Sequence, residues 1–235
     1  MMVASRGEPF FKYMAGLLIV IVAGSFGTFI ALGKNFAQPM PFMLMVHGGL
    51  FLTWYIVFYL QASHIAAGKV AAHILLGQLS IFLVMGMMLA GLLAWHGSWE
   101  RGFYPDEFDT IEQFAMVNWS DLVAFLLAYG LGLLHRPKPF FHKRFMLIAG
   151  LIMLMPATSR AAMILDVPPG VGFLVIVLCF LALVVYDFKR IGKLHKATLF
   201  GVLLLIVKTG LVMGYAPSEH WASIVHTLIG YPPTV

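Results

Sequence analysis

Hydrophobic residues in this chain form long runs that are separated by short polar segments. Seven such runs cover residues 13–32, 42–62, 74–95, 119–134, 145–165, 171–186 and 197–215. A helix needs about 20 apolar residues to cross a bilayer, and these runs reach or approach that length. The pattern therefore predicts an all-α, polytopic membrane bundle of seven transmembrane helices, with residues 1–235 forming a single transmembrane domain.

The segment that follows the seventh run has a different pattern. Its large apolar residues recur at the spacing of one helical face, and polar residues fill the other face: the apolar set is Trp221, Ile224, Val225, Leu228 and Ile229. A helix with this division lies in the interface of a membrane. We expect a short amphipathic C-terminal helix that anchors the chain to the surface.

Composition supports a membrane protein and excludes most other classes. Of the 235 residues, 61% are hydrophobic and 11% are charged, whereas soluble domains have about 25% charged residues. A soluble globular domain, a disordered segment and a disulfide scaffold are therefore excluded, and the chain has one cysteine. The net charge of +5 would indicate nucleic acid in a soluble protein. Here we expect the lipid bilayer as partner and no nucleic acid.

The charged residues also predict an orientation. Eleven of the fifteen Lys and Arg residues precede the first run or lie between runs 2 and 3, 4 and 5, or 6 and 7. Segment 97–118 carries five acidic residues against one Arg101. Because cytoplasmic loops are enriched in Lys and Arg, the N-terminus is predicted inside and the C-terminus outside.

Ionisable residues within the runs are the best functional candidates, because charge is costly inside a bilayer. His47, Asp121 and Arg160 are predicted at one depth near the outer face, and Pro156 interrupts the helix just before Arg160. An Arg160–Asp121 ion pair would neutralise both charges. Lys208, near the middle of the seventh run, is an alternative partner for Asp121.

Two further features bear on this outer layer. His47, Trp54 and Gln61 fall on one helical stripe, so Trp54 and Gln61 join the predicted ligand pocket with Asp121, Arg160 and Lys208. Asp121 also lies in the first turn of the predicted helix 119–134, where a carboxylate interacts well with the helix dipole. Under that second interpretation Asp121 is structural, and Asn118 or Ser120 supplies the cap.

A second polar layer is predicted at the inner face. It includes His73, His142 and His195, and Lys or Arg residues stand beside most of its histidines. Neighbouring cations disfavour a metal ion and suit lipid phosphates. We interpret these histidines as solvated groups at the interface.

Several segments together resemble a family of bacterial multi-pass inner-membrane proteins that has no assigned activity. The resemblance covers about residues 42–215, and it implies the bacterial inner (cytoplasmic) membrane as the location. The segments that carry it are 47–61, 72–77, His142-Lys143-Arg144, 156–160, Tyr186-Asp187 and 192–198.

Three functions are compatible with the sequence. The first is binding of a redox cofactor, b-type haem, or of a metal, and His47 and His96 are the preferred pair because both are predicted at the outer level. The second is a transporter, channel or sensor for a small anionic molecule with an outward-facing pocket, since arginine selects anionic groups. The third is a membrane enzyme acting on lipid or quinone. Three further possibilities stay open: that the chain is an enzyme, that it binds a small hydrophobic ligand, and that it assembles into an oligomer or a larger membrane complex.

Overall fold

The computed structural model describes residues 9–34, 40–105 and 107–231, and every regular element in them is a helix. The prediction of an all-α bundle is confirmed. The helices, in chain order, are α1 (Pro9–Ala31), α2 (Phe42–Ala66), α3 (Val70–Glu100), α4 (Ile111–Leu134), α5 (Pro139–Ile152), α6 (Met155–Leu165), α7 (Pro169–Ile191), α8 (Lys196–Gly210), the π-helix η1 (Leu211–Tyr215) and α9 (Glu219–Ile229).

Most of these helices are long and apolar enough to cross a membrane. Six segments pass this test within the described residues: α1, α2, α3, α4, α7, and α8 together with η1. The pair α5 and α6 passes it jointly, and it gives a seventh span when the two are counted as one. The chain is therefore a multi-pass membrane protein.

The predicted helix 145–165 is two helices, bent by 43° with respect to each other. The break falls at residues 153–154, just ahead of Pro156. Proline has no N–H to donate, and its ring clashes with the carbonyl four residues earlier, which belongs to Ile152, the last residue of α5. The interruption predicted at Pro156 therefore begins three residues earlier, at residue 153, and gives α6 a new direction.

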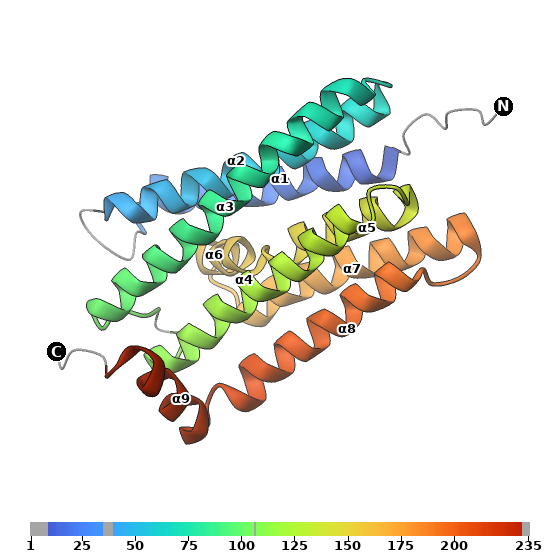
Figure 1. Cartoon of the computed structure of the whole chain (residues 1–235). Helices are drawn as coiled ribbons and strands as arrows, with labels where there is room; N and C mark the ends of the chain where they lie inside the picture. The colour runs from blue at the N-terminus through green and yellow to red at the C-terminus, as the bar shows by residue number, and fades with distance from the viewer. Residues whose placement is uncertain (1–8, 35–39, 106, 232–235) are drawn as a thin grey trace.

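α5 lies in the middle of the bundle and packs against α1, α4, α7 and α8. All residues from 147 to 152 are buried in it. α6, seen nearly end-on in Figure 1, packs against α1 and α7. The outward faces of the other helices keep large apolar side chains exposed, such as Phe82 at 71%. Such a surface is suited to lipid and not to water.

The two ends of the bundle differ in chemistry. We call one the α9 end, because α9 lies there beside α4 (Figure 1). We call the opposite end the basic end, where α5 and α8 begin and α7 finishes. Exposed cations gather there, including Lys69, Arg136, Lys138 and Lys193.

Tryptophans hold the α9 end together. Trp95 of α3 packs against Trp119 of α4, with ring centroids 4.9 Å apart. Trp119 in turn packs edge-on against Trp221 of α9 at 5.6 Å, and Trp99 joins the same cluster. This cluster is separate from the main core around α5.

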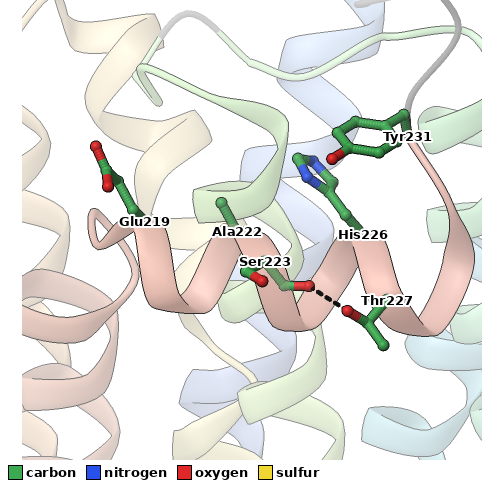
Figure 2. Close-up of a pocket in the computed structure, with 6 residues that line it drawn as sticks. All are labelled: Glu219, Ala222, Ser223, His226, Thr227 and Tyr231. Carbon is green, nitrogen blue, oxygen red and sulfur yellow. Dashed lines mark hydrogen bonds between the residues drawn. The ribbon is translucent and has the colours of Figure 1, made fainter.

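The predicted amphipathic helix is α9, and it packs on the bundle through its apolar face. Trp221 and Val225 are buried, and the Trp221 indole donates a 2.7 Å hydrogen bond to the carbonyl of Glu112 in α4. His226, whose ring lies beside that of Tyr231 in Figure 2, forms a 2.7 Å hydrogen bond through Nε2 with the Glu112 carboxylate. α9 is thus bound to protein through polar contacts that the anchoring interpretation did not include.

The start of α4 differs from the prediction. The helix begins at Ile111, where the Thr110 hydroxyl accepts a hydrogen bond from the Gln113 amide as its N-cap. Asn118 and Ser120 lie inside the helix and donate to its own carbonyls, so neither is the cap. Asp121 is consequently a buried residue of the third turn and not a residue of the first turn.

Candidate functional site

An ion pair within the membrane-spanning part of the bundle is the central feature of the candidate site. The ammonium group of Lys208 in α8 contacts the carboxylate of Asp121 in α4. Their side chains are only 11% and 9% exposed. The pairing of Asp121 with Lys208 is the alternative that the sequence left open, and it answers the need for each buried charge to have a partner.

The backbone around Lys208 departs from the regular α-helix. Lys208 lies three residues before η1, and the amide of Ala216 donates a 2.8 Å hydrogen bond to the Leu211 carbonyl, five residues back. A π-turn inside a helical segment is uncommon, and it is frequent at functional sites. The cation of the pair therefore lies next to the least regular backbone of its span.

Arg160 does not take the position predicted for it. It belongs to α6, and its guanidinium donates a 2.7 Å hydrogen bond to the Pro156 carbonyl. It also lies over the rings of Phe26 and Phe29 in α1, 4.6 and 5.7 Å from their centroids. The expected Arg160–Asp121 pair is wrong because the α5–α6 bend places α6 against α1 and α7, while Asp121 faces α8.

His47 belongs to α2, where its ring is packed on a neighbouring aromatic side chain. The charge of Arg160 acts on the His47 ring, which stacks on Phe51 at 4.2 Å. The Nδ1 atom of His47 is buried and has no hydrogen-bond partner in the described part of the chain. Of the predicted trio, Asp121 has Lys208 as its partner in place of Arg160, and a direct contact between His47 and Arg160 stays a prediction.

The other predicted ligand residues have different surroundings. His96 is 54% exposed and contacts Glu100, one turn further along α3, at 3.3 Å. Trp54 is buried in the main core against Phe58 and Phe125. Haem coordination by His47 and His96, and a pocket role for Trp54 and Gln61, stay predictions.

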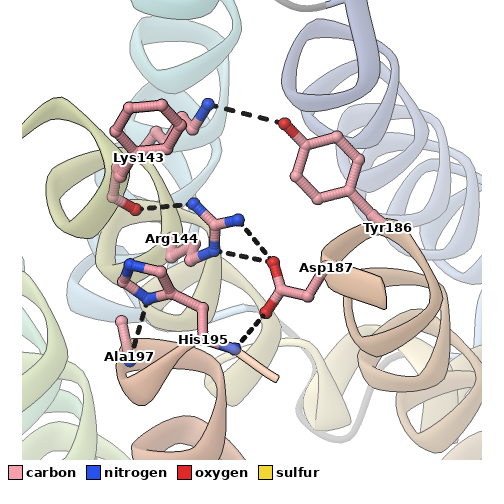
Figure 3. Close-up of polar contacts among 7 residues, drawn as sticks. Lys143, Arg144, Tyr186, Asp187, His195 and Ala197 are labelled. Carbon is pink, nitrogen blue, oxygen red and sulfur yellow. Dashed lines mark hydrogen bonds and ion pairs between the residues drawn. The ribbon is translucent and has the colours of Figure 1, made fainter. Parts of the chain in front are cut away.

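A second ion pair, at the basic end, is completely buried. The Arg144 guanidinium of α5 donates hydrogen bonds of 2.8 and 2.5 Å to one carboxylate oxygen of Asp187 in α7 (Figure 3). A third bond, of 2.8 Å, reaches the Phe140 carbonyl. Both side chains are 0% exposed. Sequence reasoning assigned Arg144 to the interfacial charges; the available signal was the lone acidic Asp187 in an otherwise basic segment.

His195 completes this cluster and connects it to α8. Its backbone amide donates to the second oxygen of Asp187 at 3.1 Å, and its Nδ1 accepts from the Ala197 amide at 3.1 Å as the N-cap of α8 (Figure 3). Burial, followed by the nearby charge of Arg144, lowers the pKa of His195. A neutral ring suits the cap, because Nδ1 must accept a hydrogen bond.

His142 and His73 meet at the same end, with ring centroids 6.1 Å apart. Nδ1 of His142 lies 2.8 Å from the Gly132 carbonyl and so is a donor to it. Nδ1 of His73 is buried without a partner among the described residues. The predicted inner layer is therefore resolved into a His73–His142 contact and a separate His195 cluster.

Two open grooves lie away from the Asp121–Lys208 pair. One, of about 460 Å³, runs along α9 and includes His226 and Tyr231 (Figure 2). The other, of about 500 Å³, lies at the basic end beside His195. Within the described residues, no group of three or more His, Cys, Asp or Glu side chains could hold a metal ion.

Comparison with known proteins assigns the chain to no family. No protein-family model, curated protein or solved structure matches this chain.

Proposed function

We propose that the chain is a bacterial inner-membrane transporter, channel or sensor for a small anionic solute, with the N-terminus in the cytoplasm. The Asp121–Lys208 pair carries the proposal. An ionisable pair within a membrane span is costly to maintain, and such residues mark solute and ion pathways. The π-helix beside Lys208 supports the same assignment.

The pair provides a simple way for an anion to act on the bundle. An entering anion competes with the Asp121 carboxylate for the Lys208 ammonium. Release of Asp121 weakens the contact between α4 and α8, so anion binding and helix movement are coupled through one exchange. Arg160, a half-buried residue of α6, supplies a second cation that favours a negative solute.

Flux through purified protein in liposomes tests the proposal. Vesicles loaded with potassium salts of chloride, phosphate, acetate or succinate are given valinomycin, so that anion movement limits volume change and light scattering reports it. We expect at least one anion to cross faster than in empty vesicles. If every anion crosses at the empty-vesicle rate and none raises the thermal stability of the protein, the proposal is wrong.

A double variant locates the activity at the pair. Asp121→Asn with Lys208→Gln removes both charges together, so no unpaired buried charge remains. We expect the folded double variant to lose anion flux at least tenfold. The matched control is Lys189→Gln, a change of one exposed cation at the basic end, which should leave flux unchanged.

Binding of b-type haem by His47 and His96 is the second hypothesis. The observation that favours it is the buried Nδ1 atom of half-buried His47, which has no hydrogen-bond partner among the described residues. Coordination would require His96 to exchange Glu100 for the iron. A Soret band in the absorption spectrum of purified protein, lost in His47→Ala, would support haem, and its absence from protein grown with haem precursor would remove the hypothesis.

A further inference from the structure

The groove at the basic end is lined by both apolar and polar side chains. It lies where α5 begins, where α7 finishes and along the connection to α8. Its volume is about 500 Å³. Phe140, Phe141 and Ile191 supply apolar surface, and Lys138, Lys193 and His195 supply polar groups. A ligand that fits both must have an apolar part and a charged part.

The charge of that ligand follows from the surroundings. None of the described residues that line the groove carries a carboxylate. Asp187, which adjoins the groove through the His195 amide, is fully buried and already accepts hydrogen bonds from Arg144 and from that amide. Lys138 and Lys193 are exposed, so their ammonium groups remain available to an anion.

The position of the groove indicates which amphipathic anion it meets. Lys138 directly precedes α5, and Ile191 is the last residue of α7, so the groove lies at the level where spanning helices end. Phe140 is 50% exposed there. Phospholipid headgroups occupy this level, and basic pockets between spanning helices bind anionic ones.

We propose that this groove binds one anionic phospholipid. Its phosphate lies between Lys138 and Lys193, and an acyl chain lies along Phe140, Phe141 and Ile191. The site is independent of the proposed anion pathway, because it shares no residue with the Asp121–Lys208 pair. Lipid binding would give two cations of the basic end, Lys138 and Lys193, a role beyond setting the topology.

Native mass spectrometry of the full chain released from detergent tests the site. The probes are phosphatidylglycerol and phosphatidylcholine with identical acyl chains. We expect one phosphatidylglycerol to be retained in preference to phosphatidylcholine. In Lys138→Gln with Lys193→Gln we expect about twenty-five-fold weaker retention, since each cation near an anionic lipid contributes about fivefold.

The matched control is Lys69→Gln with Lys189→Gln, which removes the same charge from exposed residues outside the groove. Equal losses in both double variants would show non-specific attraction and overturn the proposal. Equal retention of the two lipids would also overturn it. Displacement of the lipid by millimolar glycerol 3-phosphate would reassign the groove to a free phosphate. Thermal melting without added lipid should be the same for all variants, which confirms that they fold.

Discussion

At the scale of single residues, the Asp121–Lys208 pair makes a sharp energetic prediction. Asp121→Asn leaves a buried ammonium without a partner, and Lys208→Gln leaves a buried carboxylate. Each single change should lower the free energy of unfolding by about 3 kcal/mol. The double change should cost clearly less than the sum, because the two groups act as one unit. Thermal melts in detergent measure all three variants.

The same set of variants, two single changes and the double change, made at Asp121 and Arg160 serves as the control. Arg160 bonds to the Pro156 carbonyl and contacts aromatic rings of α1, and Asp121 contacts Lys208. The effects of Asp121→Asn and Arg160→Gln should therefore add. Strong coupling between Asp121 and Arg160 would instead restore the pairing expected from sequence.

His195 gives a pH dependence whose sign follows from its surroundings. Burial and the charge of Arg144 lower its pKa in the folded protein, so the folded state favours the neutral ring. The resulting stability is present above the unfolded pKa, about 6.5, and is lost as the pH falls below it. Protonation also removes the N-cap acceptor of α8, which costs about 1 kcal/mol.

The measurement compares the wild type with His195→Asn between pH 7.5 and 5. Asparagine also caps helices and does not titrate, so it retains the bond to Ala197 at both ends of the range. The stability difference between the two proteins should shift in favour of the variant on acidification. A pH-independent difference would mean that the cap does not depend on the protonation of His195.

At the scale of elements, the direction of α6 depends on one close approach. A Cβ atom on Gly172 of α7 would lie 2.8 Å from the Thr158 carbonyl oxygen of α6, which is backbone and cannot rotate away. Gly172→Ala should therefore destabilise the protein by about 1–3 kcal/mol. Gly170→Ala, two residues earlier in α7, meets no atom within 4 Å and should not destabilise it. Thermal melts of the two variants separate overpacking from any general effect of losing a glycine.

Sequence could predict the spans because lipid requires long apolar runs, and these are visible without any tertiary information. The prediction placed the start of α4 too late, because it followed the apolar run. The true start is marked by a local signal, since Thr110 and Gln113 are spaced as in a capping box. The prediction included the interruption near Pro156 but not the new direction of α6. The partner of Arg160 depended on that direction.

Buried charge at the basic end was missed for a different reason. Arg144 stands beside Lys143 and His142, so composition alone assigns it to the interface. Its burial depends on Asp187, which is 43 residues away in α7. The Arg144–Asp187 pair can be recognised only when the packing of α5 against α7 is known.

At the scale of the whole molecule, the orientation can be tested directly. Cysteine is introduced at exposed Glu107 or exposed Lys193, with buried Cys179 replaced by alanine. The basic end should face the cytoplasm. An impermeant maleimide added to intact cells should label the cysteine at 107 and not the one at 193. The reverse labelling pattern would show that the predicted topology is inverted. Permeabilised cells supply the control, because both cysteines should react in them.

The tryptophan cluster has an optical consequence. Four of the five tryptophans lie at the α9 end, where Trp221 joins α9 to Trp119 of α4. The fifth, Trp54, is in the main core. Most of the intrinsic fluorescence of the chain therefore comes from one end of the bundle. Separation of α9 from α4 would change the emission while the spanning helices stay folded, so fluorescence would report on this end of the bundle alone.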